Sequence, residues 1–132
     1  ALEAGKVVVC DRYADSSAAY QAAGREISAE TVRQLNAIAT GKIVPDITFL
    51  LDVPVQIGLQ RLTQNREKDR IEAEAVDFHR RVSQGFLALA KAEPQRFIVL
   101  DGLQTPEIIF DQICETLNHR FSNLLRNGET NE

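Results

Sequence analysis

Three short segments of the chain are continuously apolar and rich in β-branched residues: 7–10, 47–51 and 97–100. Apolar runs of this length, without alternation, are typical of strands that are buried on both faces. Each run is followed directly by an aspartate, namely Asp11, Asp52 and Asp101. We therefore predict three buried strands whose carboxyl ends carry three carboxylates. For Asp52 a competing interpretation is a cap on the helix that follows it.

Between and after these segments, apolar residues recur three or four positions apart, as on one face of a helix. In the first such segment they are Val32, Leu35 and Ile38, with Ser28 as the expected N-cap and Gly41 as the stop. Three later segments follow the same rule, at Val55, Leu59 and Leu62, at Phe78, Val82, Phe86 and Leu89, and at Ile109, Ile113, Leu117, Phe121 and Leu124. Strands that alternate with helices predict an α/β fold with a parallel sheet and flanking helices, which binds ligands at the carboxyl ends of its strands.

Composition narrows the class of protein. The 132 residues are 44% apolar and 26% charged, as in one ordinary domain, and a net charge of −4 argues against a nucleic-acid partner. No apolar run reaches the roughly 18 residues of a membrane helix and no signal peptide opens the chain, so we expect a cytoplasmic protein without a membrane partner. The spacing of Cys10 and Cys114 suits neither a zinc site nor a redox pair, and we expect two buried free thiols.

The first candidate site lies in the segment 11–24, DRYADSSAAYQAAG. Arg12 carries a fork of donors that fits a phosphate, and Asp11 could hold that arginine or lie near a metal ion. Ser17, Tyr20 and Gln21 share one helical face and could read the edge and flat face of a nucleobase. The competing interpretation of Arg12 is a surface salt bridge.

A second candidate is the basic, strongly polar segment 61–70, RLTQNREKDR, which contains Arg61, Arg66 and Arg70. A polar arginine-bearing connection between two helices is typical of a lid over transferred phosphates. The competing interpretation is a solvated helix end. The chain has no G-x-x-x-x-G-K-[ST] and no G-x-G-x-x-G sequence, so it lacks the usual backbone cradle for a triphosphate. We expect His79 and His119 to be surface residues.

Four segments in series resemble the bacterial thymidylate kinases. They are GKVVVCDRYADSSAAYQAAGR, PDITFLLDVP, the lid segment ending in DRIEAE, and FHRRVSQGFLALA with RFIVLDG. The resemblance covers about residues 1–120 and implies the fold of a P-loop nucleoside monophosphate kinase. It also implies transfer of the ATP γ-phosphoryl group to thymidine monophosphate with Mg²⁺, and a homodimer paired through helices that include 14–23 and 32–39.

The resemblance assigns roles to particular residues. Asp11 lies near the phosphates and the metal, and Arg12 holds the acceptor phosphate. Ser17 and Tyr20 contact the thymine edge and the deoxyribose, with Gln21 as a further candidate. The lid arginines Arg66 and Arg70 reach the ATP phosphates with help from Arg61, and Gly102 lies in the loop that approaches the adenine.

The chain departs from the family at its beginning, because the family's first strand, phosphate-binding loop and following helix are absent. The chain has no methionine and begins with Ala1, so we expect residues 1–126 to be the C-terminal part of one longer domain, with a lid at about 63–72 and a polar tail at 127–132. The family's missing strand lies between the strands that correspond to 7–10 and 47–51, so these two cannot pair. We expect the isolated chain to be inactive, and unstable or rearranged. The alternatives are another P-loop nucleoside or nucleotide kinase, or a truncated non-catalytic paralogue that binds nucleotide or dimerises.

Overall fold

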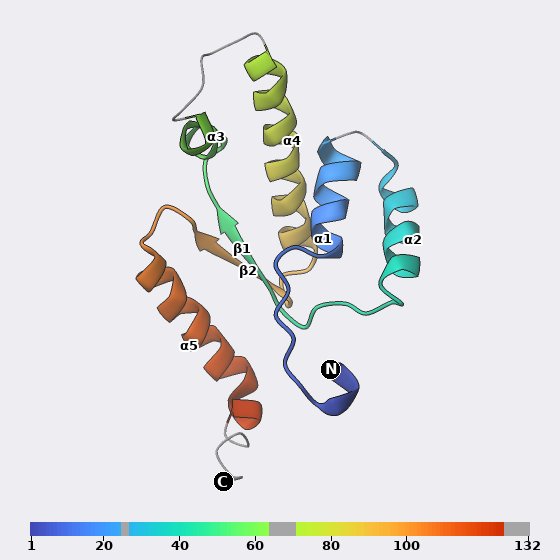
Figure 1. Cartoon of the computed structure of the whole chain (residues 1–132), viewed down its shortest axis with the longest axis vertical. Helices are drawn as coiled ribbons and strands as arrows, with labels where there is room; N and C mark the ends of the chain where they lie inside the picture. Colours follow the sequence, from blue (N-terminus) through green and yellow to red (C-terminus); the bar gives the residue numbers. More distant parts are fainter. Residues whose placement is uncertain (25–26, 64–70, 126–132) are drawn as a thin grey trace.

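The computed structural model describes residues 1–24, 27–63 and 71–125. Its helical segments alternate with two strands (Figure 1). In chain order the elements are η1 Leu2–Ala4, α1 Ala14–Ser17, η2 Ala18–Gly24, α2 Ala29–Ala39, β1 Thr48–Asp52, α3 Val55–Thr63, α4 Ile71–Ala92, β2 Phe97–Asp101 and α5 Pro106–Leu125. Helix α1 runs directly into η2, which has π-helical winding.

The two strands form a parallel sheet, paired in register from Thr48 with Phe97 to Asp52 with Asp101. Helix α5 lies on one side of the strands, and α4, α1 and α2 lie on the other (Figure 1). The predicted α/β class with a parallel sheet is therefore confirmed, and so are the strands expected at 47–51 and 97–100, to within one residue.

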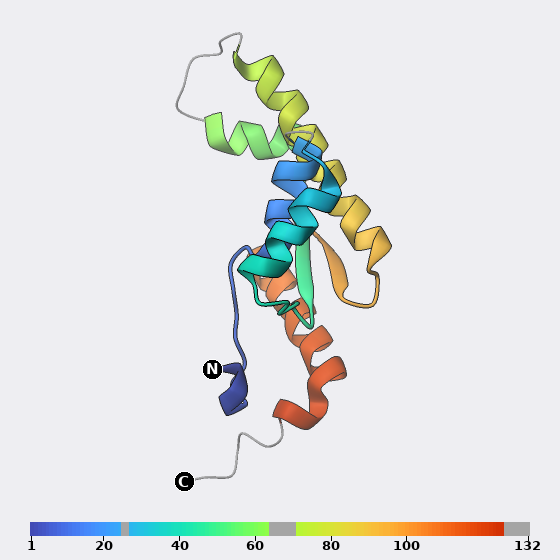
Figure 2. The same ribbon diagram turned by 90° about the vertical axis from the view of Figure 1, so that its right-hand side faces the viewer.

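The strand predicted at residues 7–10 is wrong. These residues form coil that runs into α1, and Figure 2 shows the coil set apart from β1. A strand needs a hydrogen-bonding neighbour about 4.8 Å away, and within the described residues the sheet consists of β1 and β2 alone. The expectation that 7–10 and 47–51 do not pair agrees with this sheet. Val7, Val8 and Val9 are exposed, and so is Cys10, contrary to the expected burial of both thiols.

The helix predicted from Val32, Leu35 and Ile38 is confirmed as α2, and its ends have the expected residues. Ser28 caps the helix by accepting a hydrogen bond from the backbone N–H of Thr31, and Gly41 follows with φ of 59°. Only Val32 of the three apolar residues is buried, whereas Leu35 is 60% exposed and Ile38 is 80% exposed. Three residues turn a helix by about 300°, so each of these apolar side chains points about 60° away from the previous one around the helix axis. The three side chains therefore do not all face the core.

The core of the described chain is small. Its buried apolar side chains come from η2, α2, α4 and β2 and are Ala19, Val32, Val82, Ala90, Phe97 and Leu100. The strand residues were expected to be buried on both faces, but some of them are half exposed: Leu51 is 50% exposed and Val99 is 47% exposed. A sheet of two strands leaves one edge of each strand and part of each face without cover, which explains this exposure.

Candidate functional site

Arg12 and Tyr20, which the sequence predicts as site residues, lie together. The guanidinium Nη1 of Arg12 donates a 3.4 Å hydrogen bond to the Tyr20 hydroxyl, and Arg12 Cζ lies 5.5 Å from the centre of the tyrosine ring. Arg12 has φ of 65°, an uncommon backbone conformation for a residue other than glycine. Strained backbone of this kind is concentrated at functional sites, so the turn before α1 is a candidate for one.

Aromatic residues of α4 hold the ring of Tyr20. It meets Phe78 and Phe86 edge to face, with ring centres 6.1 and 6.2 Å apart. Such contacts fix the plane of a ring, and aromatic pairs of this geometry are stabilising by about 1 kcal/mol each. The Tyr20 hydroxyl therefore has a fixed position from which it orients Arg12.

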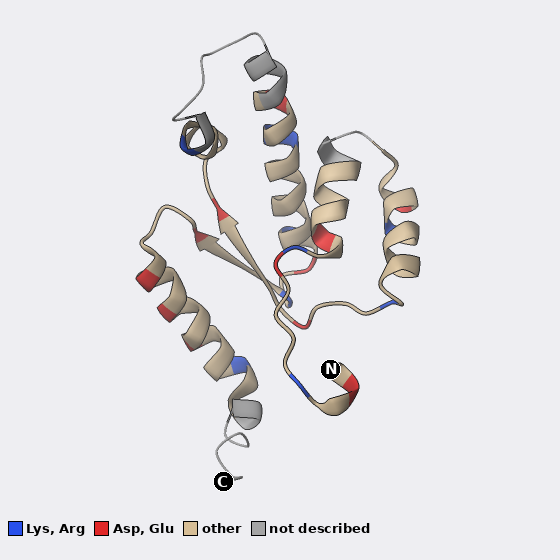
Figure 3. Ribbon diagram, viewed as in Figure 1, with Lys and Arg blue, Asp and Glu red and all other residues tan. Residues whose placement is uncertain are grey.

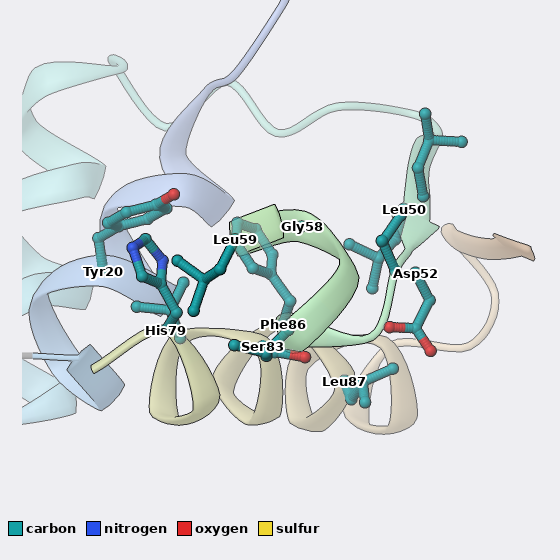
Figure 4. A pocket seen from close by; sticks show the side chains of 13 residues that line it. Tyr20, Leu50, Asp52, Gly58, Leu59, His79, Ser83, Phe86 and Leu87 are labelled. Atoms are coloured by element: carbon teal, nitrogen blue, oxygen red, sulfur yellow. The ribbon is translucent and has the colours of Figure 1, made fainter. Parts of the chain in front are cut away.

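Beside Tyr20 lies a pocket of about 290 Å³, lined by η2, the end of β1, α3 and α4. Tyr20 and His79 lie at one end of it, and Asp52 lies at the other (Figure 4). Most of the lining is aliphatic or aromatic, and Ser83 adds a hydroxyl. His79 is half buried against Phe78 rather than a plain surface residue, which corrects the sequence-based expectation.

The three aspartates do not share one strand edge as predicted. Asp52 and Asp101 end their strands as register partners, and Figure 3 shows acidic residues at both strand ends. Asp101 accepts a hydrogen bond from the backbone N–H of Leu103, so it holds the turn after β2. Asp11 instead lies exposed in the coil before α1, because residues 7–10 form no strand.

The remaining predicted residues are more scattered. Ser17 is exposed at the end of α1, Gln21 is half buried in η2, and Arg61 is exposed in the last turn of α3. Gly102 is buried directly after β2, where its N–H donates to the Asp52 carbonyl over 2.8 Å. Arg66, Arg70 and most of the predicted lid lie outside the described residues, as does the predicted tail.

A buried ion-pair cluster around Arg96 was missed by the sequence analysis. Its guanidinium donates to both carboxylate oxygens of Asp15, over 2.7 and 2.8 Å, and to Thr48 and Glu93. The hydrogen bonds that Arg96 donates to Asp15 raise the pKa of Arg96 above its ordinary value, although burial acts in the opposite direction. The sequence offered one signal for this cluster: Arg96 directly precedes a predicted buried strand, and a buried arginine requires an acidic partner. Its partner Asp15 lies 81 residues away.

No group of three or more His, Cys, Asp or Glu side chains that could hold a metal ion occurs in the described parts of the chain. In the same residues, no helix has both the length and the apolar character needed to cross a membrane.

The parallel sheet and its flanking helices define an α/β protein and agree with the fold of a nucleotide kinase. The family model for thymidylate kinase matches residues 1–113, and the chain belongs to this family. This confirms the family indicated by the sequence segments.

Curated relatives give the same result. The chain is 49% identical over 120 residues to a thymidylate kinase of Deinococcus radiodurans, a match that covers 91% of this chain and 58% of the relative. A Synechococcus thymidylate kinase is 51% identical over 120 residues, covering 91% and 57%. One of Lactobacillus helveticus is 44% identical over 122 residues, covering 91% and 58%. The chain thus spans a little over half the length of these relatives.

Proposed function

We propose that the intact protein carrying these residues transfers the γ-phosphoryl group of ATP to thymidine monophosphate, giving thymidine diphosphate. The observation that carries the proposal is the thymidylate kinase match over residues 1–113, which includes the whole Asp11–Gly24 segment. Because ATP and thymidine monophosphate are soluble nucleotides, we place the enzyme in the cytoplasm.

On the acceptor side, Arg12 binds the phosphate of thymidine monophosphate. Its guanidinium is exposed and oriented by the Tyr20 hydroxyl, so its remaining donors can form a charge-assisted fork with phosphate oxygens. The Tyr20 ring packs against the deoxyribose and disfavours a 2′-hydroxyl, while Ser17 and Gln21 contact the thymine edge. The mainly apolar pocket beside Tyr20 suits the flat face of a base.

On the donor side, Arg66 and Arg70 bring positive charge to the equatorial oxygens of the transferred phosphoryl group, with Arg61 in support. Transfer between phosphate oxygens requires chiefly positioning and charge stabilisation, which lid arginines supply. Gly102 lies in the loop that approaches the adenine.

On the protein side, the carboxylate of Asp11 would hold Mg²⁺. One carboxylate used together with the phosphates of a nucleotide is a usual way for a protein to hold Mg²⁺. The ion supplies charge neutralisation between the two phosphates when it is bound. Asp11 is exposed next to Arg12, at the turn where the phosphate is held.

We also propose that the enzyme is a homodimer that pairs in part through α2. Leu35 and Ile38 are 60% and 80% exposed, three residues apart on this helix. An exposed apolar stripe on a helix is typical of an interface.

Two substitutions in the intact protein test the proposed roles. Arg12→Ala is expected to raise the KM for thymidine monophosphate about 10- to 100-fold, because a hydrogen bond to a charged group is lost. Arg66→Ala is expected to lower kcat by about 100-fold or more, because charge stabilisation in the transition state is lost. Arg33→Ala is the control, since Arg33 is exposed and pairs with Glu30 on α2. Steady-state kinetics in which Arg12→Ala and Arg66→Ala match the control would refute the assignments.

A further inference from the structure

Asp15 and Thr48, which are distant in the chain, meet at the Arg96 guanidinium together with its near neighbours Glu93 and Phe97. Besides Asp15, the guanidinium donates to the Thr48 hydroxyl over 2.9 Å and to both carboxylate oxygens of Glu93, over 2.8 and 3.2 Å. The Thr48 hydroxyl donates in turn to Asp15 over 3.0 Å. The Arg96 Cζ also lies 4.5 Å from the centre of the Phe97 ring. Each polar side chain of this cluster therefore has a hydrogen-bond partner within it.

The Asp15–Arg96 ion pair is shielded from water, whereas the ion pairs within α2 and within α4 are exposed. The side chains of Arg96 and Asp15 are 10% and 14% exposed, against 76% and 54% for Arg33 and Glu30 of α2. A shielded, bidentate pair has far more influence on local geometry than an exposed pair, because water cannot replace either partner. The cluster thus fixes the relative positions of the elements that carry it.

These elements surround the candidate site. Asp15 lies in the first turn of α1, three residues after Arg12 and five before Tyr20. Glu93 directly follows α4, the helix whose Phe78 and Phe86 hold the Tyr20 ring. Thr48 begins β1, and Arg96 directly precedes β2. The Arg96 guanidinium consequently connects α1 and α4, the helices on either side of the Tyr20 contact, to the start of the sheet.

We infer that Asp15 is a positioning residue for the acceptor site: by binding Arg96 and Thr48, it sets the first turn of α1, and with it Arg12 and Tyr20, against α4 and the sheet. The inference rests on the proposed function for its kinetic consequence. Its structural part, the control of Tyr20 position by Asp15, does not need a nucleotide. Asp15 itself makes no contact with substrate in this account.

The first experiment measures kinetics of the intact protein with Asp15→Asn, which keeps the size of the side chain and removes its charge. The KM for thymidine monophosphate is expected to rise about 10-fold or more while the KM for ATP changes less than about two-fold, since small displacements of positioning groups have large effects. Thr48→Val removes one hydroxyl of the cluster and is expected to act in the same direction, but less. This milder variant serves if Asp15→Asn fails to fold.

Glu30→Gln is the matched control, because it removes the carboxylate of an ion pair with the same 2.7 Å distance on an exposed face of α2. It is expected to leave both KM values unchanged. If Asp15→Asn and Thr48→Val lower the melting temperature yet leave the KM for thymidine monophosphate equal to that of Glu30→Gln, the positioning role is refuted and only a stabilising role is left.

The second experiment follows Tyr20 directly. In the intact protein labelled with 3-fluorotyrosine, the ¹⁹F signal that disappears in the Tyr20→Phe variant is the signal of Tyr20. Without nucleotide, Asp15→Asn and Thr48→Val are expected to shift or broaden the Tyr20 signal, and Glu30→Gln is expected to leave it in place. An unchanged Tyr20 signal in folded Asp15→Asn and Thr48→Val proteins would overturn the inference. If the intact protein has no activity with thymidine monophosphate, the proposed function fails, while this measurement still decides whether Asp15 positions Tyr20.

Discussion

Gly102 illustrates how closely the end of the sheet is packed at the residue scale. A Cβ at this position would collide with Cγ2 of Val53 and would lie 3.1 Å from the Asp52 carbonyl oxygen. The resemblance to thymidylate kinases implies that Gly102 lies in the loop that approaches the adenine, a role that stays a prediction. The structure adds a packing reason for glycine, because a Cβ here would require the Val53 side chain or the backbone beside it to move.

Gly102→Ala is therefore expected to destabilise the intact protein by about 1–3 kcal/mol, the usual cost of inserting a methyl group into a packed site. The measurement is the free energy of unfolding in urea. Gly58→Ala is the control, because nothing lies within 4 Å of a Cβ at this helical position of α3. It is expected to stabilise by about 0.5–1 kcal/mol, since alanine is the better helix former. Equal effects of the two substitutions would contradict the packing argument.

Glu30 gives a prediction about pH. Hydrogen bonds from Arg33, and then from Gln34, lower the pKa of Glu30 below its ordinary value. A lowered pKa in the folded state means that the stabilising contribution is complete above the ordinary carboxyl pKa and is lost as the pH falls through the lowered value. Because the pair is exposed, the effect on stability is small, and the titration itself is the better observable.

The measurement for Glu30 is the carboxyl ¹³C chemical shift as a function of pH. The Glu30 midpoint is expected below that of an unpaired glutamate, and Arg33→Gln is expected to raise it. A Glu30 midpoint that is the same in the two proteins would show that the ion pair does not form in solution.

At the scale of elements, the sequence predicts well wherever a segment needs only its own residues or its neighbours in the chain. Ser28 and Gly41 define the ends of α2 by local hydrogen bonding and backbone conformation, and the apolar spacing locates α3, α4 and α5. Residues 7–10 fail this rule because a strand exists only through its pairing partner. Their valines have high strand propensity, but no described strand pairs with them.

The candidate site divides in the same way. Arg12 and Tyr20 are eight residues apart, and both were recognisable from the short motif around them. Arg96 was missed because its partners Asp15 and Thr48 are 81 and 48 residues away, and nothing local to Arg96 specifies them. The buried cluster depends on how α1, α4 and the strands pack, which hydrophobic periodicity alone does not determine.

The exposed face of α2 leads to a prediction about assembly. Leu35→Glu and Ile38→Glu place a charge on the proposed dimer interface and are expected to shift the intact protein from dimer to monomer. Arg33→Glu also makes α2 more negative, at an exposed position on the opposite face of the same helix, and is the control. Molar mass is measured by light scattering after size exclusion. Dimers that persist in both interface variants would show that α2 does not form the interface.

At the scale of the whole molecule, the chain exposes more surface than its mass warrants. Its accessible surface is 10591 Å², whereas a folded monomer of 14.7 kDa has about 6,900 Å². Many large apolar side chains contribute to the excess, among them Val7, Val9 and Phe110 at 78%, 93% and 64% exposure. The small core and the open edge of β1 agree with a chain that spans a little over half the length of its relatives.

The isolated 132-residue chain is therefore expected to bind the dye ANS and to unfold over a broad range of urea concentration, because little apolar surface is buried cooperatively. Fluorescence of the dye and circular dichroism during urea titration check this. A sharp, single unfolding transition without dye binding would show that the chain is a complete folding unit.

The most direct test of the account is the acceptor specificity of the intact protein. With ATP as donor, a coupled assay compares thymidine monophosphate, uridine monophosphate, cytidine monophosphate and thymidine as acceptors. A thymidylate kinase is expected to show its highest kcat/KM with thymidine monophosphate, and Arg12→Ala is expected to lower that value most. Preference for another acceptor, or no phosphoryl transfer to any of the four, would contradict the account.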